Sequence, residues 1–159
     1  MSNKFKEYRP NVAAIILSPN YEIDKKFFLA KRKGVRRGWQ FPQGGINENE
    51  SPQDALFREL KEEIGTSEVE IIAEYPKWIR YDFPKTSGDD KWYPYKGQNQ
   101  KYFLVKLKKE AIINLNSFIE PEFEDYMFVT EKELFKKALF LKRKTYKEVI
   151  EYFKQKGFI

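Results

Sequence analysis

Three glutamates, Glu59, Glu62 and Glu63, stand close together shortly after a pair of glycines. If residues 52–64 form a helix, a rotation of about 100° per residue places the three carboxylates within an arc of about 100°. Like charges three and four residues apart destabilise an isolated helix by roughly 0.2–0.5 kcal/mol per pair. A hard divalent cation with oxygen ligands, Mg²⁺ above all, reverses the sign of that interaction. The spacing therefore predicts a metal-dependent enzyme.

The residues around these glutamates predict a helix with well-defined ends. Ser51 suits the N-cap, Pro52 suits the first helical position, and Gly65 can adopt the left-handed conformation that ends a helix. An apolar arc lies beside the acidic one and consists of Leu56, Phe57, Leu60 and Ile64. One face of the helix is therefore expected to pack on a core, which fixes where the acidic face points.

The same stretch carries a longer pattern. Residues 44–66 match G-x5-E-x7-R-E-U-x-E-E-x-G-U, where U is a bulky aliphatic residue. A chance match to seven fixed identities is on the order of 10⁻⁸ per starting position. The stretch therefore resembles the Nudix box, although Thr66 replaces the final aliphatic residue. The Arg-Glu-Leu-x-Glu-Glu string alone would be ordinary on a solvated helix.

The resemblance to the Nudix family implies a fold and a metal site. The implied fold is an α/β/α sandwich with a mixed central sheet and a loop-helix-loop box. Glu59, Glu62 and Glu63 are expected to bind Mg²⁺, with Mn²⁺ or another divalent cation as the alternative. Glu122 adds a fourth carboxylate, and the Gly44 carbonyl is a further candidate ligand. The nearby acids that could exchange roles with Glu122 are Glu120, Glu124 and Asp125.

Arg58 precedes the acids and has a different expected role. It lies at the edge of the acidic arc, where paired hydrogen bonds to Glu50 or to a box carboxylate would orient that group. Hydrolysis also needs a base to take a proton from water, and Glu62 and Glu63 are both candidates.

The amino-acid composition excludes several kinds of catalytic and metal site. The 159 residues are 41% apolar, which suits one core and a single domain over residues 1–159. Cysteine and histidine are absent, which excludes disulfides, Cys/His zinc sites and Ser-His-Asp catalysis. No segment approaches the ~20 apolar residues of a membrane span, so a cytoplasmic protein without membrane contact is expected. The net charge of +6 suits a polyanionic substrate.

Patterning predicts alternating strands and helices. The expected strands are 11–18, 26–31, 38–41, 69–83, 100–107 and 125–129. Besides the box helix, Thr130 with Glu133 can open a short helix, and residues 144–156 suit a final one. The core positions of that last helix are expected to be Tyr146, Val149, Ile150 and Phe153. Residues 84–99 form a long polar connection with aromatic residues, which favours a functional loop.

Several stretches outside the box indicate which group of enzymes within the family the chain resembles. They resemble the bacterial RNA 5′-pyrophosphohydrolases and the related asymmetric diadenosine polyphosphate hydrolases. The matching stretches are 8–12, 38–45, 97–101, 121–123 and 142–143. The resemblance implies Mg²⁺-dependent removal of pyrophosphate from the 5′-triphosphate end of RNA, which leaves a 5′-monophosphate and initiates mRNA decay.

The same resemblance proposes substrate contacts. Those for the phosphates are Arg9, Arg32, Gln98, Gln100 and Lys101. Those for the bases are Tyr81, Trp92, Tyr95, Phe140 and Lys142. A Phe commonly precedes the Lys-Arg pair in the family, whereas Leu141 stands there in this chain and Phe140 comes one residue earlier.

Two other functions compete with this one. A diadenosine polyphosphate hydrolase would use the same acids on a nucleotide cap. A noncatalytic RNA- or nucleotide-binding module would keep the fold without the chemistry, but it has no need for three carboxylates that face a polyphosphate.

Overall fold

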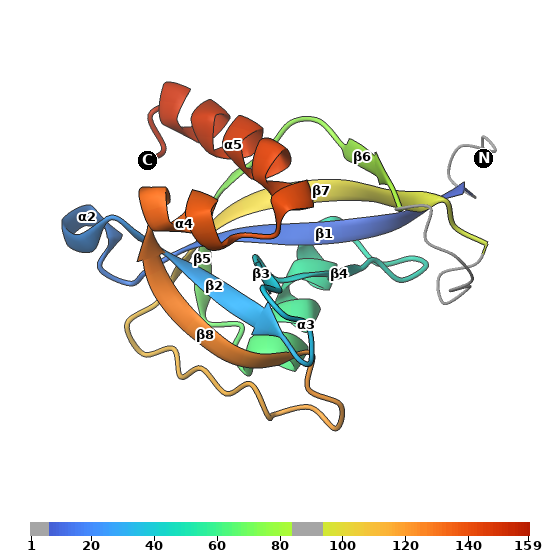
Figure 1. Cartoon of the computed structure of the whole chain (residues 1–159), viewed down its shortest axis with the longest axis horizontal. Helices are drawn as coiled ribbons and strands as arrows, with labels where there is room; N and C mark the ends of the chain where they lie inside the picture. Colours follow the sequence, from blue (N-terminus) through green and yellow to red (C-terminus); the bar gives the residue numbers. More distant parts are fainter. Residues whose placement is uncertain (1–6, 84–93) are drawn as a thin grey trace.

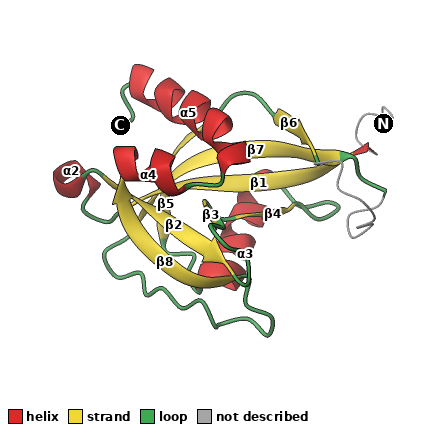
Figure 2. Ribbon diagram, in the orientation of Figure 1, coloured by secondary structure: helices red, strands yellow, loops and turns green. Residues whose placement is uncertain are grey.

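The computed structural model describes residues 7–83 and 94–159, and it has helices on both faces of one mixed sheet (Figure 1). The strands are β1 (Tyr8–Leu17), β2 (Lys26–Arg32), β3 (Trp39–Gln40), β4 (Gln43–Gly45), β5 (Val69–Glu74), β6 (Ile79–Asp82), β7 (Gly97–Leu107) and β8 (Phe123–Thr130). The helices are α2 (Tyr21–Asp24), α3 (Pro52–Ile64), α4 (Glu131–Lys137) and α5 (Phe140–Gln155). Figure 2 shows α5 and α3 on opposite sides of the sheet. The predicted α/β/α sandwich is confirmed.

The sheet divides where β1 changes partners. β1 pairs in parallel with β7 along its whole length, from Tyr8 opposite Gly97 to Leu17 opposite Lys106. It pairs with β2 only at its C-terminal end, whereas its N-terminal half pairs with β4. β2 and β8 therefore diverge from β1 and β7, as Figure 1 shows. The short strand β4, which leads into the box, lies at this divergence.

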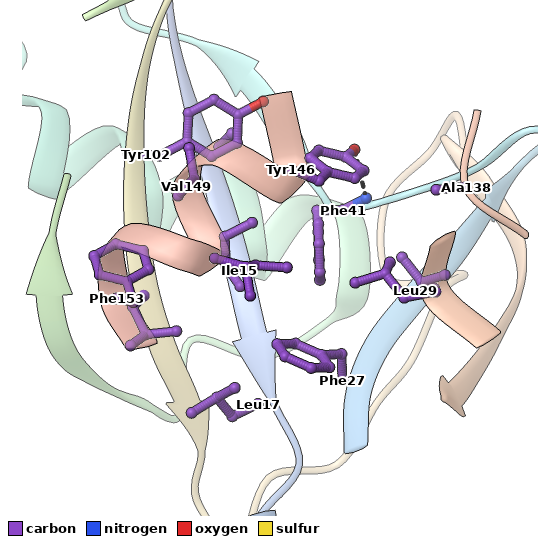
Figure 3. Packing of buried hydrophobic residues seen from close by; sticks show 14 of the residues in the cluster. Ile15, Leu17, Phe27, Leu29, Phe41, Tyr102, Ala138, Tyr146, Val149 and Phe153 are labelled. Atoms are coloured by element: carbon purple, nitrogen blue, oxygen red, sulfur yellow. Dashed lines mark hydrogen bonds between the residues drawn. The ribbon is translucent and has the colours of Figure 1, made fainter. Parts of the chain in front are cut away.

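Side chains alternate across the sheet and fill two separate cores. On β1, Ile15 and Leu17 face α5, whereas Val12, Ala14 and Ile16 belong to the core beneath α3. The core on the α5 side holds the four predicted helix residues, and all four are buried. Figure 3 shows Tyr146 beside Phe41, whose N–H donates to the Tyr146 hydroxyl at 3.0 Å.

Several predicted boundaries were wrong, and β1, for example, begins at Tyr8 rather than at residue 11. The segment 69–83 forms two strands, β5 and β6, because Pro76 between them has no N–H for a ladder hydrogen bond. Gly97 to Asn99 belong to β7 rather than to a loop. Helix α5 begins at Phe140, four residues earlier than expected, because its exposed first turn does not follow apolar spacing.

No helix in the described part of the chain combines the length and the apolar character that a membrane crossing needs. A cytoplasmic location stays a prediction.

Candidate active site

Helix α3 holds the box glutamates with the predicted bounds, Pro52–Ile64. The Ser51 hydroxyl accepts a hydrogen bond from the Asp54 N–H at 3.1 Å, and Gly65 ends the helix with φ 78°. Leu60 and Ile64 are buried in the core between α3 and the sheet. The helix therefore has a fixed rotation, and it presents its acids toward β4.

Arg58 ties this helix to the loop before it. Its guanidinium donates to both Glu50 carboxylate oxygens at 2.8 and 2.9 Å, to Glu59 at 2.8 Å and to the Gly45 carbonyl at 2.8 Å. Bidentate pairing of this kind is strong and directional. The hydrogen bond from Arg58 lowers the pKa of Glu50 to about 2, so Glu50 stays ionised at neutral pH. The predicted pairing of Arg58 with Glu50 is present.

Glu63 is the most unusual of the acids. Its residue is only 7% exposed, and its Oε2 has no hydrogen-bond partner among the described residues. Burial raises the pKa of the Glu63 carboxyl well above its usual range, and the Glu59 and Glu122 carboxylates raise it further. Burial also raises the pKa of Glu59, against the opposing effect of Arg58. An unpaired buried carboxylate is costly, so the pair requires a proton or a cation.

The three box glutamates do not converge as the helical arc suggested. Glu62 turns toward Arg58, at 3.5 Å, and its side chain is 34% exposed. Glu59 and Glu63 approach each other instead. Within residues 7–83 and 94–159, no three or more acidic side chains are arranged so that they could hold a metal ion. The Arg58 Nη1 contacts both Glu59, at 2.8 Å, and Glu62, at 3.5 Å, so one guanidinium offsets part of the charge of both carboxylates.

A cavity of about 620 Å³ opens in front of Glu59 and Glu63. The predicted residues that line it are Arg9, Arg32, Gly44, Glu59, Glu63, Tyr81, Gln98, Glu122, Phe140 and Lys142. They come from both halves of the divided sheet and from both covering helices. Carboxylates and cations therefore meet in one hollow where the sheet opens, which we call the catalytic cavity.

Two glycines of β4 let charged groups approach the backbone. A Cβ on Gly44 would lie 2.0 Å from the Glu59 carboxyl carbon, and one on Gly45 would lie 2.2 Å from an Arg9 guanidinium nitrogen. Neither distance is tolerable for a real side chain. A larger residue at either position would displace the Glu59 carboxyl or the Arg9 guanidinium, so glycine lets an acid and a cation pack directly against the strand.

Lys142, from α5, forms part of the cavity wall. Its Nζ is 3.4 Å from the Gln100 side-chain oxygen and 4.1 Å from the centre of the Tyr81 ring. Burial lowers the pKa of Lys142 to about 7, with the nearby Arg32 acting in the same direction. Arg32 itself lies 3.8 Å from Glu122. This wall thus combines one permanent cation with an amine that titrates near neutrality.

Some predicted residues do not reach the cavity. Gln100 is buried behind it, donating to Asn11 at 2.9 Å and to Gln43 at 3.0 Å. Lys101 points to the other face of β7, because neighbours on a strand alternate, and its Nζ pairs with Glu74 at 3.1 Å. Neither placement supports the predicted contact with phosphate. Tyr95 does not line the cavity, and Trp92 lies outside the described residues.

Three amides that the sequence reasoning did not assign also line the cavity: Asn11, Gln40 and Gln43. Asn11 is 1% exposed and Gln40 is 5% exposed. Polar residues inside apolar strand runs are the signal that could have identified them, because a buried amide needs hydrogen-bond partners.

Comparison with known proteins identifies the family. The family model described as "NUDIX domain" matches residues 7–153. The chain belongs to the Nudix family. Nudix hydrolases generally need a divalent metal ion, and the unpartnered oxygen of Glu63 beside Glu59 fits that requirement.

Similar Nudix proteins are known both by sequence and by structure. The chain is 61% identical over 153 residues to the RNA pyrophosphohydrolase of a Nitratiruptor species, a match that covers 96% of this chain and 97% of that protein. It is 58% identical to the RNA pyrophosphohydrolase of a Sulfurovum species over the full length of both. Among solved structures, the E. coli dihydroneopterin triphosphate pyrophosphohydrolase matches with a TM-score of 0.67 at 15% identity, covering 87% of this chain and 93% of that one. This last likeness concerns the fold alone.

Proposed function

We propose that this Nudix hydrolase removes pyrophosphate from the 5′-triphosphate end of RNA and leaves a 5′-monophosphate. The observation that carries the proposal is the pair of the buried Glu63 and the partly buried Glu59, whose cavity also holds Arg9, Arg32 and Lys142. Acids that need a cation thus share one hollow with cations that suit phosphate. The RNA pyrophosphohydrolases that are 58–61% identical to the chain over nearly its whole length support RNA as the substrate.

Glu59 and Glu63 are the proposed metal ligands, and Glu62, Glu122 and the Gly44 carbonyl are further candidates. A bound Mg²⁺ would neutralise phosphate oxygens and make a water molecule more acidic. Arg58 positions Glu59 through its 2.8 Å hydrogen bond. Glu62 or Glu63 accepts the proton of the attacking water, and Glu63 is favoured because it lines the cavity.

Cationic groups in the cavity hold the triphosphate in this proposal. Arg9 and Arg32 face the same space as the acids and offset the charge of the phosphate chain. The bond between the α- and β-phosphates breaks, so the pyrophosphate departs with the negative charge that these groups stabilise. Gln98, whose side-chain oxygen accepts from the Tyr81 hydroxyl at 2.8 Å, has its amide available as a neutral donor.

The aromatic residues of the cavity are the proposed base contacts. Phe140 is 80% exposed, and Tyr81 is half-buried beneath Lys142. Stacking of a base on such a ring contributes roughly 1–3 kcal/mol. Phe140 therefore supplies the aromatic ring that the family commonly carries at the position of Leu141.

Product analysis tests the proposal. Purified protein with Mg²⁺ is given 5′-triphosphorylated RNA and, separately, dinucleoside polyphosphates. We expect pyrophosphate and 5′-monophosphorylated RNA, loss of the reaction on chelation, and recovery with excess Mg²⁺. If the protein cleaves only the dinucleotides, the RNA assignment is wrong. If it cleaves neither, the hydrolase assignment is wrong.

A further inference from the structure

A second hollow, of about 650 Å³, lies beside the catalytic cavity and shares Leu139 and Phe140 with it. The side chains that give it its character are Arg36, Arg37, Trp39, Lys136, Lys137 and Arg143, and we call it the basic groove. Of the residues that the structure describes, none with a carboxylate lines it. The groove is therefore cationic, and it is continuous with the proposed site of hydrolysis.

The groove joins two segments that are about 100 residues apart in the sequence. Trp39 and Ala138 form a parallel β-bridge, and the Leu139 N–H donates to the Trp39 carbonyl at 2.9 Å. These backbone contacts hold the turn before β3 against the end of α4. Two basic runs, residues 31–37 and 136–144, are thus brought together by the fold.

Four of the five groove cations have no ion-pair partner among the described residues. Arg36, Arg37, Lys136 and Lys137 are exposed, and none of them forms an ion pair in the described ranges. The charge of Lys137 acts on Glu133, one helical turn earlier, but the two do not form a salt bridge. Like charges held together in this way repel one another, so an anion that lies between them is bound favourably.

Arg143 organises the floor of the groove. Its guanidinium donates to the Ala138 carbonyl at 2.8 Å and to the Lys136 carbonyl at 2.9 Å, where α4 ends. It also lies 5.7 Å from the centre of the Phe140 ring. An ordered cation beside an exposed ring gives the groove a fixed shape, whereas the other four cations reach into solvent.

We propose that the basic groove binds the phosphodiester backbone of the RNA strand that follows the 5′ nucleotides held in the catalytic cavity. This inference rests on the proposed function. A groove of cations with aromatic rings at its edge is the arrangement that binds single-stranded nucleic acid without reading its sequence. Phe140 marks the passage between the two hollows, because it lines both. Substrates of several nucleotides should therefore bind more tightly than substrates that end inside the cavity.

The test compares a ten-nucleotide triphosphorylated RNA with a triphosphorylated dinucleotide. The variant Arg36→Ala/Lys136→Ala removes two exposed cations and leaves Arg143 in place. Each phosphate contact to a single strand contributes about 0.7 to the slope of log affinity against log salt, so two lost contacts correspond to roughly 25-fold weaker binding at ~0.1 M salt. We expect KM for the ten-nucleotide RNA to rise by about that factor, while kcat and the dinucleotide KM stay unchanged.

A control removes the same charge elsewhere. Lys109 and Lys156 are exposed and do not line either hollow. The Lys109→Ala/Lys156→Ala variant should keep the chain-length preference of the wild type. Its salt slope should also be unchanged, whereas that of the groove variant should fall by about 1.4.

Other outcomes separate the two proposals. If the wild type hydrolyses both RNAs but the groove variant matches the control, the groove does not bind RNA. If the groove variant instead loses binding to vesicles of anionic lipid and keeps its RNA kinetics, the groove is a membrane-binding surface and the inference is overturned. If the wild type hydrolyses neither RNA, the proposed function fails first. Fluorescence anisotropy with a labelled 5′-hydroxyl RNA then still measures whether the groove binds a strand.

Discussion

The catalytic cavity and the basic groove are adjacent and similar in volume, but they differ in the sign and the exposure of their charged groups. The cavity balances Arg9, Arg32 and Lys142 against three carboxylates, and several of these groups are buried and held by hydrogen bonds. The groove has five cations, no carboxylate among its described residues, and mostly exposed side chains. Buried, balanced charge suits bond breaking, because fixed groups act strongly where water is excluded. Exposed, single-signed charge suits binding of a flexible polyanion.

The largest effect should come from Glu63, which tests whether the chemistry belongs to the cavity. Glu63→Gln keeps the shape of the side chain but removes its charge. We expect kcat for triphosphorylated RNA to fall by roughly 10²–10⁴-fold, the usual range for a lost general base or equivalent group. Circular dichroism should show an unchanged fold.

Glu68→Gln is the matched control, because Glu68 is exposed and pairs only loosely with Lys108, at 3.8 Å. It should retain wild-type kcat. Equal activity of the two variants would remove Glu63 from the site.

The pKa of Lys142 reports whether water is excluded from the catalytic cavity, in contrast to the exposed basic groove. Folding lowers the pKa of Lys142 from its ordinary value of 10.5 to about 7, so the unfolded chain binds more protons between these pH values. Stability should therefore rise with pH across this window, whereas below about pH 7 the full cost of burying the charged amine is present. Between pH 7 and 9.5 the gain is about 3 kcal/mol.

Urea denaturation of the wild type and of Lys142→Met at several pH values measures this effect. The Met variant lacks the titrating amine, so the stability difference between the two proteins should shrink as pH rises. A constant difference would mean that Lys142 is solvated.

Two cations, one that lines the cavity and one that does not, test which positive groups contact the phosphate chain. Arg32 lines the cavity, whereas Lys101 points away from it and pairs with Glu74. Loss of a charged hydrogen bond costs about 1.5–3 kcal/mol, so Arg32→Gln should raise KM for triphosphorylated RNA by roughly ten- to a hundredfold. Lys101→Gln should change KM less than twofold. Steady-state kinetics on both variants measure these effects. A larger rise in KM for Lys101→Gln than for Arg32→Gln would contradict this assignment.

The groove variant Arg36→Ala/Lys136→Ala should have the most limited effect, a roughly 25-fold rise in KM that is confined to long RNA. A fall in kcat for the dinucleotide would show that the two regions are not separate.

The sequence was most informative where chemistry depends on helical spacing. The bounds of α3, its caps at Ser51 and Gly65, and the pairing of Arg58 with Glu50 follow from local rules and are present in the structure. The buried face of α5 was also predicted, because apolar periodicity reports directly on packing.

The sequence was least informative where two segments meet. Helical geometry grouped Glu62 with Glu59 and Glu63, but Glu62 does not line the cavity that the other two share. Lys101 resembled a phosphate ligand, but strand alternation turns it to the opposite face of β7. The basic groove was not foreseen, because it exists only when Trp39 meets Ala138 and Leu139. Such contacts are long-range and leave no local pattern.

We propose above all that the buried Glu63 and the partly buried Glu59 together hold a divalent cation. Calorimetric titration of Mn²⁺ into the wild type, Glu63→Gln and Glu68→Gln tests it without any turnover. We expect the wild type and Glu68→Gln to bind Mn²⁺ equally, and Glu63→Gln to bind it at least tenfold more weakly. Equal Mn²⁺ affinity in all three proteins would contradict the claim.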